Sequence, residues 1–164
     1  MTTVTPTEGT PVRAGLILDG AITGDRWLPP AEQAPAPGEP RILTLEQWQA
    51  AGGPAVQLAV DDDPAPLLPA LASLELVAVH FDSFMDGRGF SLARRLREAG
   101  FAGELRARGQ LLPDQAHYLH RCGFNALEFT DTRRLATALE QLKVFSHSYQ
   151  GAVDQPQPLF RRRA

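Results

Sequence analysis

The sequence predicts an α/β fold whose core is a four-stranded, mainly parallel sheet of repeated βα units, preceded by a small N-terminal β-hairpin. From residue 55 onward, short apolar segments of strand length alternate with segments of helix length. The connections between them are only a few residues long, so neighbouring strands require parallel pairing through right-handed crossovers. The same local units build either a doubly wound sheet or a half-barrel, and the sequence leaves both arrangements open.

The first third of the chain predicts a less regular region. Residues 1–13 are polar and are expected to be disordered. Within residues 14–54, Asp19-Gly20 separates two apolar runs, which is typical of a hairpin turn. Five prolines in residues 29–40 predict an extended loop, and residues 42–51 predict a short helix with Thr44 as its N-cap.

Residues 55–150 predict the α/β core, and residues 151–164 an extended, arginine-rich tail. The strand of residues 74–81 is almost continuously apolar, as in strands buried on both faces. The predicted strands are 55–60, 74–81, 104–108 and 125–129. The predicted helices are 66–73, 91–99, 113–121 and a last one with the apolar stripe Leu135, Leu139, Leu142 and Phe145.

Composition excludes several classes of protein. The 164 residues fit one domain, and a net charge of −3 argues against a nucleic-acid-binding protein. No apolar run approaches a membrane span and no signal peptide is recognisable, so we expect a cytoplasmic protein. The single cysteine, Cys122, excludes a disulfide framework within the chain, and we expect it to be largely buried and inert.

We expect no cofactor and no metal. No phosphate-binding or dinucleotide-binding fingerprint is present. His117, His120 and Cys122 share one predicted helix, but no carboxylate or second cysteine stands at a recognised metal-ligand spacing.

Function is expected at the carboxyl ends of the parallel strands. The turn of residues 86–91 places two glycines, an arginine and a hydroxyl group at a helix N-terminus, which suits an anion. The alternative is a tight turn in which Asp86 or Ser91 caps the helix. Arg106 and Arg108 point to one face of their strand, either to bind substrate or to form structural ion pairs with Glu104 or Asp86.

We therefore predict one concave, electropositive site that contains Arg88 and Arg106. Asp86 and Asp114 are the candidate acid or base groups. The candidate anion-binding residues are Gly87, Arg88, Gly89, Ser91, Arg106, Arg108 and Gln115.

Several motifs in order resemble a known bacterial family. Residues 81–115 (FDSFMDGRGFSLARRLREAGFAGELRARGQLLPDQ), then RCGFNALEF and the closing PLFRRR, resemble the domain of unknown function 934. The resemblance covers about residues 40–164. It implies a role in assimilatory sulfite reduction, because the family is typically encoded beside sulfite reductase and is often labelled a probable oxidoreductase. It brings no established catalytic residues.

Three functions remain open. The chain could be an accessory protein of sulfate and sulfite reduction that binds a small oxyanion or the sulfite reductase at the carboxyl end of the sheet. It could be an enzyme or oxidoreductase acting on a small anionic metabolite through the Asp and Arg loops. It could also be a structural subunit that docks through its tail, and a homo-oligomer remains open.

Overall fold

The computed structural model describes residues 13–162 and shows an α/β fold built on one mixed sheet of seven strands. The strands lie in the order β2-β1-β7-β6-β5-β4-β3. They are β1 (Arg13–Leu18), β2 (Ala21–Asp25), β3 (Leu43–Thr44), β4 (Ala55–Ala59), β5 (Leu76–Phe81), β6 (Glu104–Gly109) and β7 (Ala126–Phe129).

The sheet is larger than the predicted four-stranded one. The four predicted strands are present as β4 to β7 and are parallel. The predicted hairpin of β1 and β2 does not stand apart, because β1 pairs antiparallel with β7 and extends the sheet on that side. On the other side, the short β3 pairs parallel with β4. Both additions satisfy backbone groups that the edges of a four-stranded sheet would leave unpaired.

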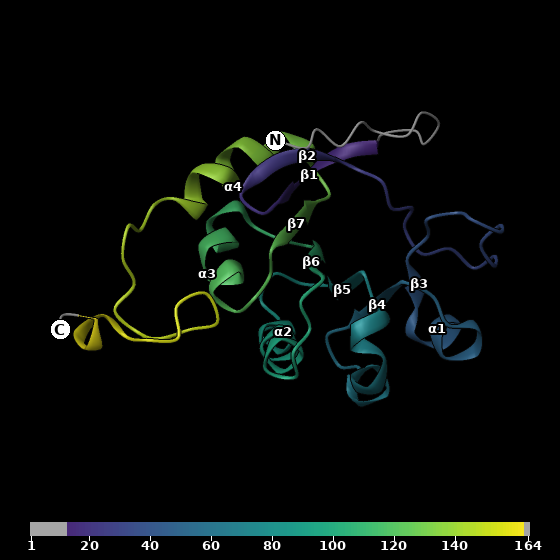
Figure 1. Ribbon diagram of the computed structural model, residues 1–164. Helices are drawn as coiled ribbons and strands as arrows, with labels where there is room; N and C mark the ends of the chain where they lie inside the picture. The colour runs from purple at the N-terminus through teal and green to yellow at the C-terminus, as the bar shows by residue number, and fades with distance from the viewer. Residues whose placement is uncertain (1–12, 163–164) are drawn as a thin grey trace, which may run out of the picture.

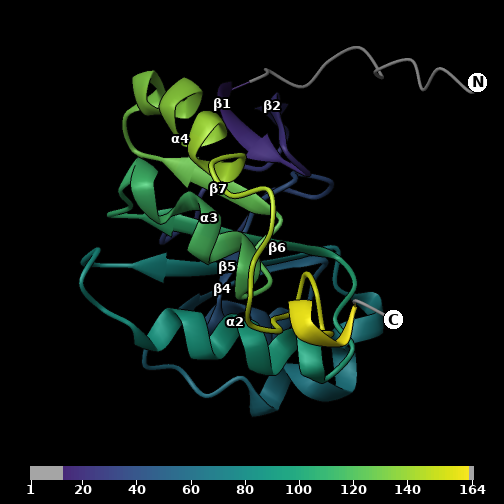
Figure 2. The ribbon, with the colours of Figure 1, turned by 90° about the vertical axis from the view of Figure 1, so that its left-hand side faces the viewer.

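The sheet resembles a half-barrel rather than a doubly wound sheet. Strands β3 to β7 follow one another in chain order, so right-handed crossovers place all their connecting helices on the same face. The α-helices are α1 (Leu45–Ala51), α2 (Arg88–Glu98), α3 (Ala116–Arg121) and α4 (Leu135–Leu142), and the 3-10 helices are η1 (Ala65–Ser73), η2 (Pro113–Gln115), η3 (Thr132–Arg134) and η4 (Leu159–Arg161). In Figure 1 the strands follow an arc with the helices on its outer side, and Figure 2 shows α2, α3 and α4 in front of the sheet.

The helices differ from prediction mainly at their ends. Thr44 is the N-cap of α1, as predicted, and forms a capping box with Gln47. The predicted helix 66–73 is the 3-10 helix η1, because its prolines lack the N–H groups that an α-helix needs. Helix α4 ends at Leu142, so Phe145 is not part of its apolar stripe and is 62% exposed.

The two faces of the sheet have different chemistry. The face under the helices is apolar, and along β6 it receives Leu105 and Ala107. The intervening side chains of Glu104, Arg106 and Arg108 lie on the other face, which we call the helix-free face. The strand residues of the main core are Ile17, Val56, Leu58, Val77, Val79, Phe81, Leu105, Ala107, Leu127 and Phe129.

The N-terminal third crosses the helix-free face. Trp27 and Ile42 are buried there in a small second cluster with Ala55, Leu76 and Ala78. This cluster explains why β5 is apolar on both faces, as its sequence predicts. The predicted disordered segment 1–13 lies outside the described residues except for Arg13, which begins β1.

The tail packs back onto the helices. The Val153 N–H donates to the Arg121 carbonyl at the end of α3, and Arg121 forms an ion pair of 3.3 Å with Asp154. A shallow hollow between this segment and α2 is lined by Arg94 and Arg97. Residues 151–162 are therefore attached to the body of the protein and end in the short helix η4.

Gly109 is expected to be essential for the end of β6. It has a φ of +102°, and a Cβ atom there would collide with the Phe81 carbonyl oxygen. We expect Gly109→Ala to cost about 1–2 kcal/mol of backbone strain plus roughly 1–3 kcal/mol for overpacking, measured by urea unfolding. Gly20→Ala is the matched control, because Gly20 has a φ of +77° with open space around it and should cost only the strain. Equal losses in the two variants would contradict the collision.

Candidate functional site

Polar side chains gather in two places. The first, which we call the charged network, lies on the helix-free face over β6 and β7. The second is the segment of residues 82–90, which follows β5 and includes the first turn of α2; we call it loop 82–90. The charged network consists of Asp25, Gln57, Glu104, Arg106, Arg108 and Glu128.

Arg106 is the centre of the charged network. Its side chain is only 1% exposed although it carries a full charge. Asp25 accepts from both terminal nitrogens of the guanidinium, at 2.8 and 2.9 Å. Glu104 accepts from Nε at 2.8 Å and Glu128 from Nη1 at 3.0 Å. The buried charge is therefore fully partnered, as a buried guanidinium requires.

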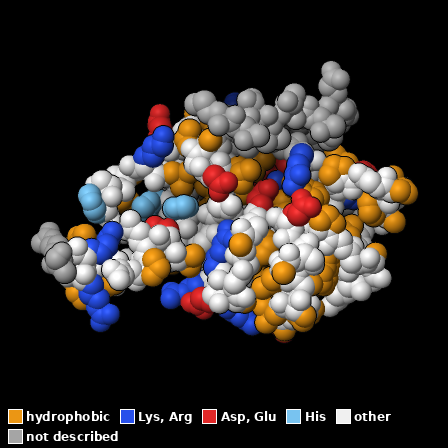
Figure 3. Space-filling model, viewed as in Figure 1, with side chains coloured by type: hydrophobic (Ala, Val, Ile, Leu, Met, Phe, Trp, Pro, Cys, Tyr) orange, Lys and Arg blue, Asp and Glu red, His pale blue; other side chains and the backbone are white. Residues whose placement is uncertain are grey.

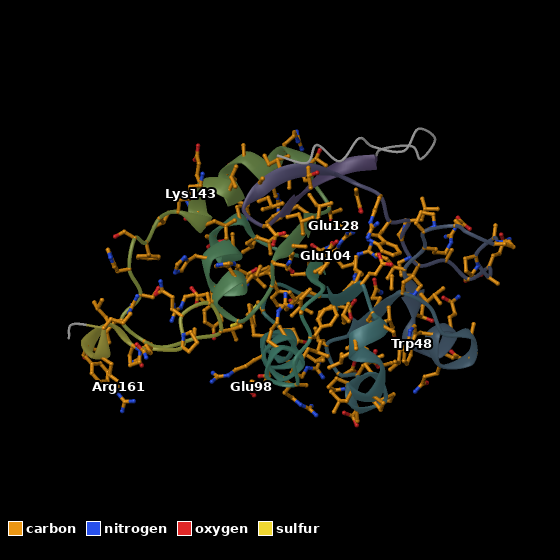
Figure 4. The ribbon with its side chains drawn as sticks, in the orientation of Figure 1. Trp48, Glu98, Glu104, Glu128, Lys143 and Arg161 are labelled. Carbon is orange, nitrogen blue, oxygen red and sulfur yellow. The ribbon has the colours of Figure 1, made fainter. Side chains whose placement is uncertain are left out.

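Arg108 extends the network along the same face. It donates to Gln57 at 2.9 Å and to Glu128 at 3.1 Å. His80, Arg108 and Glu128 occupy one row across β5, β6 and β7. Figure 4 labels Glu104 and Glu128, and Figure 3 shows acidic and basic side chains next to each other in this part of the molecule.

Sequence reasoning missed three members of this network: Asp25, Gln57 and Glu128. Asp25 is 81 residues away from Arg106 in the chain, so no local spacing connects them. Gln57 and Glu128 each alternate with apolar neighbours in their strands, and that alternation was a usable signal for a polar face.

The network is not the electropositive site that we predicted. Its two guanidinium groups meet the three carboxylates of Asp25, Glu104 and Glu128. Burial raises the pKa of Glu104 above its ordinary value, and the charge of Arg106 offsets this only partly. Burial alone would lower the pKa of Arg106, but its carboxylate partners raise it.

Arg88 lies elsewhere. It begins α2, which packs on the apolar face, whereas Arg106 lies on the helix-free face. The Arg88 guanidinium forms an exposed ion pair with Asp86, with contacts of 3.0 and 2.7 Å. Arg88 and Arg106 therefore do not form one site, because Arg106 lies within its strand, opposite Ala78 and Ala126, and not at the carboxyl end.

Loop 82–90 is held by its own hydrogen bonds. Asp86 accepts from the Arg88 N–H at 3.1 Å, which holds the tight turn before α2, but the N-cap of the helix is Gly87, so neither Asp86 nor Ser91 is the capping residue that the alternative expected. Gln115, a predicted anion-binding residue, instead joins two loops: it donates to the Phe84 carbonyl at 2.8 Å and accepts from the Leu112 N–H at 3.1 Å. Gly89 is buried against Phe81, where a Cβ atom would collide with the ring.

The remaining candidates have free side chains or other roles. Ser91 and Asp114 are exposed, and within residues 13–162 their side chains make no hydrogen bond. Gly87 is exposed and has open space around it. Cys122 is half-buried, less than we expected, and burial raises the pKa of its thiol. Within the described range, no three His, Cys, Asp or Glu side chains gather as possible metal ligands.

This geometry limits the chemistry of both places. Hydrogen bonds from Arg88 lower the pKa of Asp86, which keeps that carboxyl deprotonated and makes it a poor proton donor at neutral pH. Arg106 has its donors occupied by carboxylates and is not available as an anion clamp. The network therefore holds the sheet face, and loop 82–90 is the better candidate for contact with a ligand or partner.

Removing Arg106 should strongly destabilise the fold. In Arg106→Met, three carboxylates lose their shared cation, so we expect a loss of about 3–5 kcal/mol in chemical unfolding. Arg94→Met is the matched control, since Arg94 forms an exposed i,i+4 pair with Glu98, and its unfolding midpoint should not change measurably. A midpoint for Arg106→Met equal to that of the control would contradict the expected cost of leaving the three carboxylates without their cation.

Two carboxyl groups should give pH effects of opposite sign. The folded-state pKa of Glu104 is raised, so the folded state binds its proton more tightly than the unfolded chain does. Stability relative to Glu104→Gln should therefore fall as the pH rises above the ordinary pKa of glutamate. The pKa of Asp86 is lowered, so its carboxylate stabilises the folded state above the ordinary pKa of aspartate, and stability relative to Asp86→Asn should fall as the pH drops below that value. Unfolding of the three proteins between about pH 3 and pH 7 checks the two signs, and the same direction of change with pH for both variants would contradict the assignment.

Comparisons with known proteins give a family but no characterised relative. No curated protein and no solved structure matches the chain. No helix in the described part of the chain is long and apolar enough to cross a membrane. The family model described as a bacterial protein of unknown function (DUF934) matches residues 55–160, from β4 to the tail. The chain therefore belongs to the DUF934 family.

Proposed function

We propose that this chain is a non-catalytic, cytoplasmic accessory protein of assimilatory sulfite reduction that docks on sulfite reductase through loop 82–90. The observation that carries the proposal is that this loop holds two large apolar side chains in solvent: Phe84 is 44% exposed and Met85 is 81% exposed. The connection with sulfite reduction comes from the family resemblance of residues 81–115.

The loop is rigid enough to present these side chains in one arrangement. The Met85 N–H donates to the Ser83 hydroxyl at 3.2 Å, and the Asp86 N–H donates to the Ser83 carbonyl at 3.1 Å. Gln115 fixes the Phe84 carbonyl from a neighbouring loop. Little conformational freedom is left for a partner to remove, which favours binding.

The chemistry of the loop suits a protein partner better than a free oxyanion. Methionine, aromatic residues and arginine are enriched in protein interfaces. Both carboxylate oxygens of Asp86 bind Arg88, so a sulfite or sulfate ion would have to compete with a carboxylate two residues away. A partner surface with an apolar pocket for Met85 and acceptors for the outer side of Arg88 would leave this ion pair intact.

The proposal predicts that a charge at the loop tip weakens docking. In Met85→Glu, a carboxylate replaces the apolar anchor, and we expect at least tenfold weaker binding to purified assimilatory sulfite reductase from the same organism, measured by biolayer interferometry. The unfolding midpoint should stay within about 2 °C, because the side chain is exposed.

Phe160→Glu is the matched control, because Phe160 is equally apolar and 58% exposed but lies in the tail. It should bind like the native chain. Loss of binding only in Phe160→Glu would support docking through the tail, and native-like binding by both variants would overturn the loop proposal. Thermal stabilisation by sulfite, sulfate or adenylyl sulfate that Arg88→Ala abolishes would favour oxyanion binding at the loop instead.

A further inference from the structure

A pocket of about 280 Å³ lies at the amino end of β7, on the edge of the sheet opposite loop 82–90. Its wall is formed by β1 and β7 of the sheet and by α3 and α4 of the helix layer. The apolar lining comes from five residues of these elements and of the turn before β7: Ile17, Phe124, Leu127, Leu139 and Leu142. A pocket of this size, lined mainly by apolar side chains, is close to the lower limit for small-molecule sites.

The polar groups on one side of the pocket satisfy each other. The Asp19 carboxylate accepts from Asn125 Nδ2 at 3.1 Å, and the Asp19 N–H donates to the Asn125 carbonyl at 2.8 Å. Asn125 Oδ1 accepts from Arg97 and from the Leu105 N–H, at 3.0 and 2.7 Å. These groups need no ligand, and the charge of Asp19 is balanced in part by the nearby Arg97.

The basic side chains on the other side of the pocket are different. Lys143, the only lysine of the chain, lines the pocket at the end of α4, where Figure 4 labels it. In the part of the chain that the structure describes, its ammonium group has no carboxylate within 4.0 Å. His120, on α3, also lines the pocket, and its ring makes no hydrogen bond within residues 13–162.

The C-terminal ends of α3 and α4 lie at the pocket, and free carbonyl groups at a helix C-terminus would normally repel an anion. At the end of α3 the Leu119 and His120 carbonyls accept from the N–H groups of Phe124 and Gly123, and at the end of α4 the Glu140 carbonyl accepts from the Lys143 N–H. These carbonyls are therefore occupied, and the ammonium group of Lys143 supplies the positive charge at this side of the pocket.

We propose that this pocket binds a small amphipathic monoanion: an aromatic or branched aliphatic group in the apolar part, with a carboxylate or sulfonate at Lys143. A single ammonium group beside an imidazole suits one negative charge, whereas phosphate groups are more often held by arginine forks. This site is separate from loop 82–90 and does not depend on the proposed docking function.

The test uses the full chain with three probes: 3-phenylpropionate, its neutral analogue 3-phenylpropan-1-ol, and propionate, which has the charge without the ring. Chemical-shift changes in ¹H–¹⁵N NMR give the affinity and the location together. We expect 3-phenylpropionate to shift amides around Leu127 and Leu139, and to bind about tenfold more tightly than either of the other probes.

Two variants on α4 test the role of the ammonium group. Lys143→Gln should remove the preference for the acid over the alcohol and leave binding of the alcohol unchanged, and Lys143→Arg should restore the preference. Glu140→Gln, on the same helix but outside the pocket lining, should behave like the native chain. Equal binding of acid and alcohol by the native chain, shifts confined to another region, or a preference that survives Lys143→Gln would overturn the proposal.

Discussion

The buried guanidinium of Arg106 is the constraint on which the arrangement of this fold depends. A charge that is 1% exposed in the middle of a sheet face has to be surrounded by acceptors, and two of its three carboxylate partners come from β6 and β7. The third, Asp25, comes from the end of the hairpin, at the far side of the sheet in strand order. The contact therefore requires the chain after β2 to turn back over the helix-free face. From there Trp27 reaches the second apolar cluster over β4 and β5.

This constraint explains why a half-barrel can exist with one face uncovered by helices. A full barrel closes its inner face with layers of apolar side chains. Here the apolar cluster of Trp27 and Ile42 covers β4 and β5, and the charged network occupies β6 and β7. Such a network is not a strong source of stability compared with apolar packing, but losing one of its members is costly. We therefore expect its main role to be to specify one position for the hairpin, and not to add free energy.

Whether a feature of the fold could be predicted from the sequence depends on how far apart in the chain the interacting residues are. Alternating strands and helices, the Thr44 cap and the two-sided burial of β5 depend on neighbours in the chain, and all three were predicted. The β6 strand was harder to recognise, because Leu105 and Ala107 face the helices while the arginines face the network. The pairing of β1 with β7 and the contact of Asp25 with Arg106 join residues roughly a hundred positions apart. Hydrophobic periodicity in the sequence gives no indication of such contacts.

The site was predicted in part, for the same reason. The rule that function lies at carboxyl ends of strands selected the turn of residues 86–91 as an anion site, which stays a prediction, and it also grouped Arg106 with Arg88, which the structure contradicts. Arg106 is the middle residue of the predicted strand 104–108, and the register places it opposite Ala78 and Ala126 within the sheet, so the rule for strand ends did not apply to it. Gln115 was chosen as an anion ligand because it follows β6, yet its amide is used to join the loops that carry Phe84 and Leu112.

Helix α2 connects the two surfaces proposed for binding. It begins at Arg88 in loop 82–90, and near its other end Arg97 donates to the Phe101, Gly103 and Gly123 carbonyls and to the side chain of Asn125 at the pocket. A rigid element between two sites does not by itself couple them, because coupling needs an element with two alternative arrangements. The Arg97 guanidinium donates to all four of these acceptors at once, and these hydrogen bonds fix α2 against the segments that lead into β6 and β7. The physical role of this connection is to keep the carboxyl-end loop and the amino-end pocket in constant positions, so we expect the two proposed sites to act independently of each other.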